Sequence, residues 1–137
     1  MSRPILLDTC AALWLANKSG LREESLDELR SMQEVGGGVM VSPITAWEIG
    51  LLVSRGRLAL ELEPTAWFRA LLASGIELAE LPIEVLIASS FLPGGALRDP
   101  SDRIIAATAR AFRYRLMTRD RPLLDFAAAG HLEAIAC

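Results

Sequence analysis

The chain has 137 residues, of which 52% are hydrophobic and 23% charged. It is therefore long enough for one domain with its own core and too apolar to be disordered. A net charge of −3 argues against a globally basic nucleic-acid binder. The only two cysteines, Cys10 and Cys137, form no C-x-x-C pair, which argues against a disulfide scaffold or a cysteine-ligated zinc site.

The apolar run near the N-terminus is interrupted by Asp8, which the apolar region of a signal peptide would not tolerate well. No apolar run approaches the ~18 residues of a membrane span. We therefore expect a cytoplasmic protein with no membrane partner, folded as a single domain over residues 1–137.

Strands and helices are predicted to alternate along the chain. The wholly apolar runs at residues 5–7 and 39–41 are typical of strands that are buried on both faces of a parallel sheet. Further strands are predicted at residues 76–81, 115–118 and 132–136, the last at a sheet edge. Helices are predicted near residues 11–16, 22–34, 65–73, 82–91, 100–112 and 122–128, and another begins at 43 and includes at least residues up to 52. An extended arm or edge segment is predicted at 57–63. This alternation predicts an α/β fold with a parallel sheet covered by helices on both sides.

Two glycine and proline features refine these predictions. Gly36-Gly37-Gly38 is followed by no Lys-Ser/Thr pair and opens no helix, so it is interpreted as a flexible link and not as a phosphate-binding loop. Asp99 and Pro100 are typical of the cap and the first residue of a helix, and Asp102 falls in its first turn. Asp99 can therefore be only a helix cap, and Asp102 only an acid that the helix dipole stabilises in the first turn. Alternatively, both acids belong to a functional site.

Glu48 is the most unusual residue of its predicted helix. At helical spacing it falls among Ile44, Trp47, Leu51 and Leu52, which predict an apolar, buried stripe. A carboxylate is costly to bury unless it is paired, protonated or bound to a cation. Glu48 can be satisfied by a buried arginine or by backbone groups, or it can have a functional role.

Four acids are predicted to meet at one edge of the sheet. Asp8 and Asp120 follow the first and fourth strands, Glu48 looks inward from a helix, and Asp102 begins the helix that leads into the fourth strand. Such a cluster repels itself and needs protons or hard cations. Oxygen-only ligands favour Mg²⁺, with Mn²⁺ as a substitute. A metal of this kind can activate water for attack at phosphorus.

The basic residues are concentrated beside these acids. Seven of the 14 basic residues lie between positions 98 and 121, and all seven are arginines, the side chain best matched to phosphate. Arg103, Arg110 and Arg113 fall on the solvent side of their helix, either as a phosphate-contacting strip or as an ordinary solvated face.

Other chemistries have little support. His131 is the only histidine, which argues against serine, cysteine and paired-histidine mechanisms. Cys10 lacks a neighbour that would lower its pKa and is interpreted as a small packing residue. The only lysine is Lys18, which leaves a phosphoacceptor domain without its basic partner.

Four motifs together resemble the PIN-domain ribonucleases, especially the VapC toxins of type II toxin-antitoxin pairs. They span essentially the whole chain and read Leu7-Asp8-Thr9, Ala46-Trp47-Glu48-Ile49, Arg98-Asp99-Pro100-Ser101-Asp102-Arg103-Ile104-Ile105-Ala106-Ala107 and Met117-Thr118-Arg119-Asp120. The resemblance implies a three-layer α/β/α domain around a mostly parallel sheet of four to five strands. It also implies an acidic Mg²⁺ site that cuts single-stranded RNA, a homodimer, and an antitoxin whose tail lies over the acidic groove.

By position, the resemblance assigns the catalytic and metal-binding roles to Asp8, Glu48, Asp102 and Asp120, with Asp99 as a further metal residue. Thr9 and Thr118 match hydroxyl residues beside the first and last acids. We predict that they contact substrate together with Arg103 and Arg119. In one branch of the family a histidine and a phenylalanine stand where this chain has Leu97 and Ser101, so the subfamily, the RNA target, the number of metal ions and the antitoxin stay open.

The leading hypothesis is therefore a Mg²⁺-dependent endoribonuclease that acts as a toxin. The alternative is a catalytically weak module of the same fold that mainly grips an antitoxin or RNA.

Overall fold

The computed structural model describes residues 3–17, 20–34, 36 and 38–137. Its centre is a sheet of five short strands in the order β3-β2-β1-β4-β5, and every neighbouring pair is parallel. The strands are β1 (Ile5–Leu7), β2 (Val39–Val41), β3 (Glu77–Leu78), β4 (Arg115–Thr118) and β5 (Glu133–Ala136).

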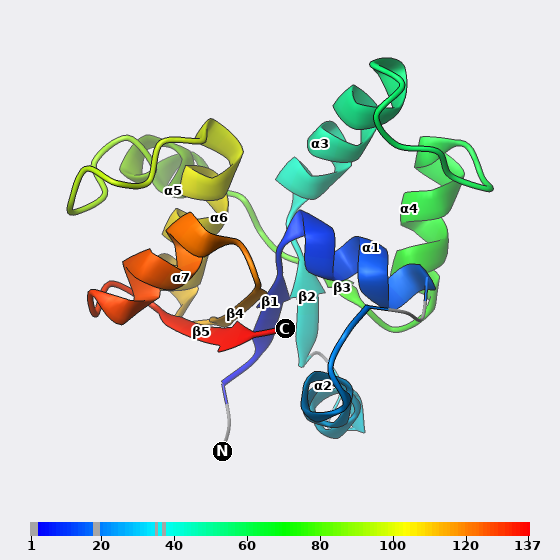
Figure 1. The fold of residues 1–137 in the computed structure, drawn as a ribbon, viewed down its shortest axis with the longest axis horizontal. Helices are drawn as coiled ribbons and strands as arrows, with labels where there is room; N and C mark the ends of the chain where they lie inside the picture. Colours follow the sequence, from blue (N-terminus) through cyan, green and yellow to red (C-terminus); the bar gives the residue numbers. More distant parts are fainter. Residues whose placement is uncertain (1–2, 18–19, 35, 37) are drawn as a thin grey trace.

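The described helices cover the sheet from both sides. Figure 1 shows α1, α3 and α4 on one side of the molecule and α5, α6 and α7 on the other. They are α1 (Thr9–Asn17), α2 (Glu23–Glu34), α3 (Pro43–Ser54), α4 (Pro64–Ala73), α5 (Ile83–Ala88), α6 (Pro100–Phe112) and α7 (Arg121–Ala128). The predicted α/β/α architecture is confirmed.

Alternating side chains of the central strands feed two separate cores. In β1, Ile5 and Leu7 pack with residues of α1, α2 and α4 on one face of the sheet, whereas Leu6 packs with α6 and α7 on the other. All three side chains are fully buried. Because successive residues of a strand point to opposite faces, a strand covered on both sides must be apolar throughout.

The direction of the chain through the sheet reverses between β1 and β4. From β1 the chain proceeds outward through β2 to β3, and it then returns to form β4 and β5 on the other side of β1. In open parallel sheets, ligands bind outside the carboxyl ends of the strands at such a switch point. Leu7 pairs with Met117 in register, so Asp8 and Thr118 emerge side by side at this edge.

The structure changes several predicted boundaries. The third strand is only two residues long, residues 57–63 form no strand, and the helix predicted at 82–91 spans Ile83–Ala88. In the glycine link, Gly37 lies outside the described residues. Gly38 serves close packing, because a Cβ there would lie 2.3 Å from the Met32 carbonyl oxygen. Within the described residues, no helix combines the length and apolarity that a bilayer crossing requires.

A substitution at Leu116 tests the core between the sheet and helices α6 and α7. Its side chain is fully buried among α6 and α7, whereas Leu62 is 49% exposed. We expect Leu116→Ala to lower the free energy of unfolding by about 2–5 kcal/mol, because it leaves a cavity that the core cannot fill. Leu62→Ala should change it by about 0.5 kcal/mol or less. Urea unfolding measures both, and equal losses would contradict this account of the core.

Candidate active site

Asp8 is the most enclosed of the predicted site acids. It directly follows β1 and is 5% exposed. Its Oδ1 accepts a hydrogen bond from the Ala11 backbone nitrogen at 2.7 Å, and its Oδ2 accepts one from Thr118 Oγ1 at 2.6 Å. One carboxylate oxygen is thus fixed by the start of α1 and the other by the end of β4. The orientation of Asp8 follows from the pairing of β1 with β4.

Glu48 lies in a setting that the sequence analysis predicted wrongly. The buried residues of α3 are Thr45 and Ile49, and Trp47 is 57% exposed, so the predicted stripe through Trp47 is not the buried face. Thr45, Glu48 and Ile49 share a face at helical spacing, and this face points toward α1. Glu48 is half-buried there.

Thr9, supported by Thr45, donates a hydrogen bond to the Glu48 carboxylate. Thr9 Oγ1 donates to Glu48 Oε1 at 2.5 Å and lies 3.1 Å from Thr45 Oγ1. Because the single hydroxyl proton of Thr9 goes to Glu48, Thr45 donates to Thr9. No described arginine lies within ion-pair distance of Glu48. A buried ion pair with the described residues is therefore excluded as the reason for Glu48.

Asp99 and Asp120 both cap helices at this edge. Asp99 Oδ1 accepts from the Ser101 nitrogen and from Ser101 Oγ, each at 3.0 Å, at the start of α6. Asp120 Oδ2 accepts from the Leu123 nitrogen at 3.4 Å at the start of α7, and its own nitrogen donates to Thr118 Oγ1 at 3.0 Å. The predicted cap at Asp99 is confirmed, and each cap retains a second carboxylate oxygen for other partners.

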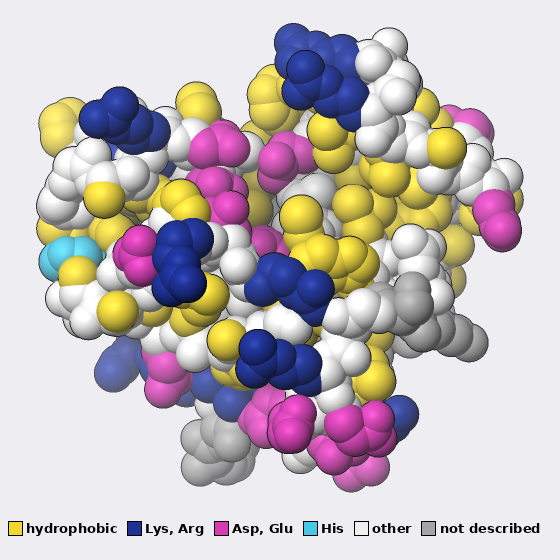
Figure 2. Space-filling view, in the orientation of Figure 1, with side chains coloured by type: hydrophobic (Ala, Val, Ile, Leu, Met, Phe, Trp, Pro, Cys, Tyr) yellow, Lys and Arg dark blue, Asp and Glu magenta, His cyan; other side chains and the backbone are white. Residues whose placement is uncertain are grey.

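Asp102 carries the largest electrostatic perturbation. Its pKa is raised from 3.8 to about 7, chiefly by burial and then by the carboxylates of Asp99, Asp120, Glu48 and Asp8, in that order. Because the interaction between charges weakens with distance, the four other carboxylates lie near enough to Asp102 to raise its pKa. Figure 2 shows Asp and Glu side chains gathered in the hollow between the α5–α7 side and the α1–α3 side of the molecule.

The same acids affect the pKa of Asp8. Burial raises its pKa above 3.8, the hydrogen bonds from Thr118 and Ala11 lower it, and Asp120 and Glu48 raise it. The ion pairs among the described residues join Arg3 to Glu133, Arg30 to Asp27, Arg115 to Glu28 and Arg121 to Asp125. None of them includes a site acid, so the described residues leave the cluster's negative charge uncompensated.

A hard divalent cation fits this set of donors. The acids at this edge offer carboxylate oxygens, and a bound cation would relieve their mutual repulsion. Within the described ranges, no three carboxylate, histidine or cysteine side chains already stand close enough to hold one ion. Mg²⁺ commonly keeps several water ligands and takes only one or two carboxylates directly, which suits an open cluster of this kind.

The predicted substrate contacts have different surroundings. Thr9 and Thr118 are buried, and their hydroxyls hold Glu48 and Asp8. Arg103 donates from Nε to the Ser89 carbonyl at 2.8 Å and from Nη1 to the Leu97 carbonyl, which ties α6 to the chain before it. Arg119 is exposed and lies over Trp14. Of the four, Arg119 alone presents an exposed side chain.

Two residues with a clear task were absent from the predicted site. Thr45 supports Thr9 and is fully buried, and Ser101, which is 4% exposed, makes both contacts to Asp99. A hydroxyl residue three positions before Glu48 was the available signal for Thr45. Leu97 is buried in the α6–α7 core. The departures at Leu97 and Ser101 are thus accommodated by packing and capping, without loss of a carboxylate.

Cys10 is not enclosed as predicted. It is exposed, so its interpretation as a packing residue is wrong. Partial burial and the charges of Asp8, Glu48, Asp120 and Asp102 raise the pKa of its thiol to about 11. The thiol therefore stays protonated at neutral pH, where only the thiolate would be a good nucleophile.

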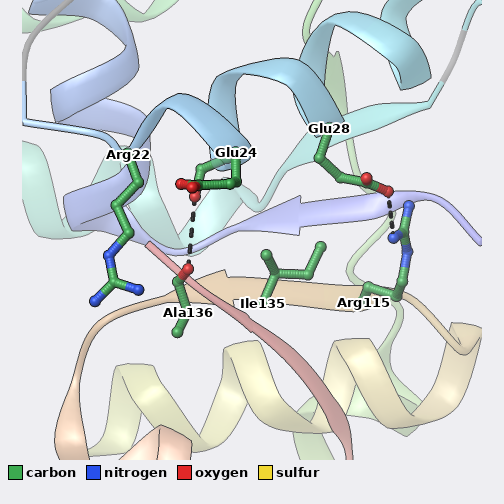
Figure 3. Close-up of a pocket in the computed structure, with 7 residues that line it drawn as sticks. Arg22, Glu24, Glu28, Arg115, Ile135 and Ala136 are labelled. Atoms are coloured by element: carbon green, nitrogen blue, oxygen red, sulfur yellow. Dashed lines mark hydrogen bonds and ion pairs between the residues drawn. The ribbon is translucent and has the colours of Figure 1, made fainter.

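A recess between α2 and β5 lies apart from the acids. It is a cavity of about 450 Å³ (Figure 3), in which Arg115 Nη1 contacts Glu28 Oε1 at 2.5 Å. Arg115 Nε also donates to the Arg3 carbonyl at 2.9 Å. Arg22 and Arg115 are balanced by Glu24 and Glu28, so this recess has no net charge to attract an anion. The contact between Arg115 on β4 and Glu28 on α2 connects α2 to the sheet.

Comparison with known proteins gives consistent matches along the chain. The family model of the PIN domain matches residues 5–129. Ribonuclease VapC22 of Mycobacterium tuberculosis is 28% identical over 120 residues, which covers 87% of this chain and 88% of that protein. VapBC2 from Rickettsia felis, bound to a promoter DNA fragment, has a TM-score of 0.71 at 18% identity, with 96% of this chain and 97% of that chain covered. DNA-bound VapBC from Salmonella typhimurium has a TM-score of 0.68 at 16% identity, with 98% of both chains covered.

The raised pKa of Asp102 predicts how stability depends on pH. Between 3.8 and about 7 the folded protein holds a proton that the unfolded chain has lost. Protein in EDTA should therefore lose stability as the pH rises from about 4 to about 7, and above that the contribution of Asp102 should be level. Mg²⁺ should restore stability mainly at the high end, where the carboxylates are charged. Thermal unfolding across this range measures both effects.

Asp102→Asn should flatten this pH profile, because it removes the titrating group. Asp125→Asn provides the matched control, since Asp125 is an exposed acid on α7 with only a distant ion pair. A wild-type profile that rises with pH, or one that Asp102→Asn leaves unchanged, would contradict the assignment.

Proposed function

This chain belongs to the PIN domain family, and on that premise we propose that it is a single-domain, cytoplasmic, Mg²⁺-dependent endoribonuclease. We propose that it cuts single-stranded regions of RNA and acts as the toxin of a type II toxin-antitoxin pair. The similarity to Ribonuclease VapC22 supports the reaction class.

One observation carries the proposal. Asp8, Glu48, Asp102 and Asp120 share the carboxyl edge of the sheet at its switch point, and no described cation pairs with them. Four carboxylates left unpaired at such a place destabilise the empty fold, which makes a purely structural role a poor explanation. A phosphodiester substrate would be repelled by the same charge unless a cation accompanied it.

Asp8, Glu48, Asp102 and Asp120 would hold the metal, with the exposed Asp99 as a further metal residue. A divalent cation bound there supplies activation of water and stabilisation of the charge that develops at phosphorus. The protein's own part is orientation. Thr118 and the Ala11 nitrogen fix both oxygens of Asp8, and Thr9 fixes one oxygen of Glu48. Hydrogen bonds of this kind keep carboxylates in one rotamer despite their repulsion.

The proposed partners are an antitoxin and a second copy of the chain. One similar structure is VapBC2 from Rickettsia felis, and another is a toxin-antitoxin complex from Klebsiella pneumoniae. These likenesses support an antitoxin partner here. For self-association, the support is a group of exposed apolar side chains on and after α5. Ile83 is 69% exposed, Ile87 62% and Phe91 79%. Apolar side chains gathered in this way are typical of an interface.

Cleavage of RNA by the purified, antitoxin-free protein tests the proposed reaction. We expect discrete fragments with Mg²⁺ or Mn²⁺ and none with EDTA. Asp8→Asn should abolish cleavage. Thr118→Val removes only the hydroxyl that orients Asp8, and it should lower kcat/KM by about 10–100-fold.

Asp125→Asn removes one exposed acid on α7 and should cleave as the wild type does. A folded wild-type protein that cuts no RNA, yet copurifies with and binds an antitoxin, would favour the catalytically weak binding module. Full activity of Asp8→Asn would contradict the site assignment.

Sedimentation tests the proposed dimer. Ile87→Arg places a charge on the exposed apolar group of α5 and should shift a wild-type dimer to monomer. Arg69→Ala, on exposed α4 surface, should leave the sedimentation coefficient unchanged. A wild-type monomer at the concentrations used for cleavage would contradict the dimer.

A further inference from the structure

Arg119 forms an unusual exposed stack beside the acidic cluster. It follows the last residue of β4 and precedes Asp120, so its Cα is about 3.8 Å from that of a site acid. Its guanidinium carbon lies 3.6 Å from the centre of the Trp14 ring on α1. This distance places the planar guanidinium in contact with the indole, an arrangement that combines cation–π attraction with stacking.

Backbone carbonyls hold the guanidinium in place. Arg119 Nη2 donates to the Cys137 carbonyl at 2.7 Å and to the Gly20 carbonyl. The indole is held as well, because Gly20 lies so close that an added Cβ would be 3.2 Å from Trp14 Cδ1. Gly20 has φ +90°, which favours glycine at this position. The stack is therefore fixed at both members before any ligand binds.

The stack lies on the same edge of the sheet as the acids. The Cys137 nitrogen donates to the Thr118 carbonyl at 3.1 Å, and Thr118 Oγ1 donates to Asp8 at 2.6 Å. Contacts thus connect Arg119 to Asp8 through Cys137 and Thr118. Figure 2 shows Lys or Arg side chains beside hydrophobic ones over α1, below the acid-lined hollow.

The stacked guanidinium of Arg119 offers a planar surface that suits a nucleobase. A phosphate binds the N–H edges of a guanidinium, and here Nη2 already donates to two carbonyls. One flat face is covered by Trp14 and Nη2 is engaged by two carbonyls, yet the residue is exposed, so the opposite flat face can be open to a ligand alongside the Nε and Nη1 edge. Unstacked bases of single-stranded RNA stack on aromatic side chains and on arginine planes.

We propose that the Arg119 guanidinium, supported by Trp14, is the platform on which a base next to the scissile phosphate stacks. The inference rests on the proposed ribonuclease activity and adds a base-binding subsite to it. The platform reads a π-face and not a hydrogen-bonding edge, so it favours unpaired RNA without requiring one base at that position.

The test combines protein variants with abasic RNA. A short single strand with one mapped cleavage site is prepared with the natural base, or with an abasic unit, at each position next to the cut. For the wild type, one abasic unit should lower kcat/KM by about 5–100-fold, the equivalent of one stacked base. Arg119→Ala should cleave the abasic and natural strands with nearly equal kcat/KM.

Two further variants separate stacking from charge. Arg119→Lys keeps the positive charge but has no planar face, so it should behave as Arg119→Ala does. Arg121→Ala removes a neighbouring exposed arginine that lies 3.9 Å from the Asp125 carboxylate. It should keep the full penalty for the abasic unit. Thermal unfolding of each variant confirms that the protein compared is folded.

The outcomes are distinguishable. If the wild type cleaves RNA but loses nothing on any abasic strand, or if Arg119→Lys keeps the abasic penalty, the platform is wrong and the ribonuclease stands. If Arg119→Ala lowers kcat/KM by the same factor on both strands, so that the wild-type penalty for the abasic unit persists, the platform is wrong and Arg119 only holds α1 and Cys137 in place. A folded wild-type protein without cleavage overturns the proposed function and the platform with it.

Discussion

The hydrogen bond from Thr118 to Asp8 is the contact on which the rest of the site depends. It is 2.6 Å long, fully enclosed, and joins the ends of the two strands between which the chain reverses its direction through the sheet. Thr118 also accepts from the Asp120 nitrogen. One hydroxyl therefore orients the first acid and positions the backbone of the last. The register of β1 with β4 thus sets the relation between these two acids.

Repulsion among the acids is the cost of this arrangement. The fold meets it with neutral hydrogen-bond donors: hydroxyls at Asp8 and Glu48, and helix N-termini at Asp99 and Asp120. Neutral donors fix the direction of a carboxylate and leave its charge intact. An arginine in the same places would have removed the charge that a cation requires. The site is thereby kept negative and orderly at the same time.

The arginines near the acids make other contacts and do not pair with these carboxylates. Arg103 binds two carbonyls that precede α6, and Arg119 lies flat on Trp14 although it is adjacent to Asp120. Both guanidiniums hold backbone together around the acidic hollow. Some of the arginines that are concentrated in this part of the sequence therefore have a structural role, and only the others remain for the proposed contact with RNA.

The sequence by itself determined the local parts of this protein. The apolar runs gave β1 and β2, the cap and proline at Asp99 and Pro100 gave the start of α6, and the resemblance brought together the positions of Asp8, Glu48, Asp102 and Asp120. These signals are local, because strand burial and helix capping depend on residues a few positions apart. Tertiary structure alone decided which face of α3 is buried, that Thr45 supports Glu48 through Thr9, and that Arg119 meets Trp14. Each of these contacts joins separate elements, so it depends on how the elements pack, which periodicity within one element does not record.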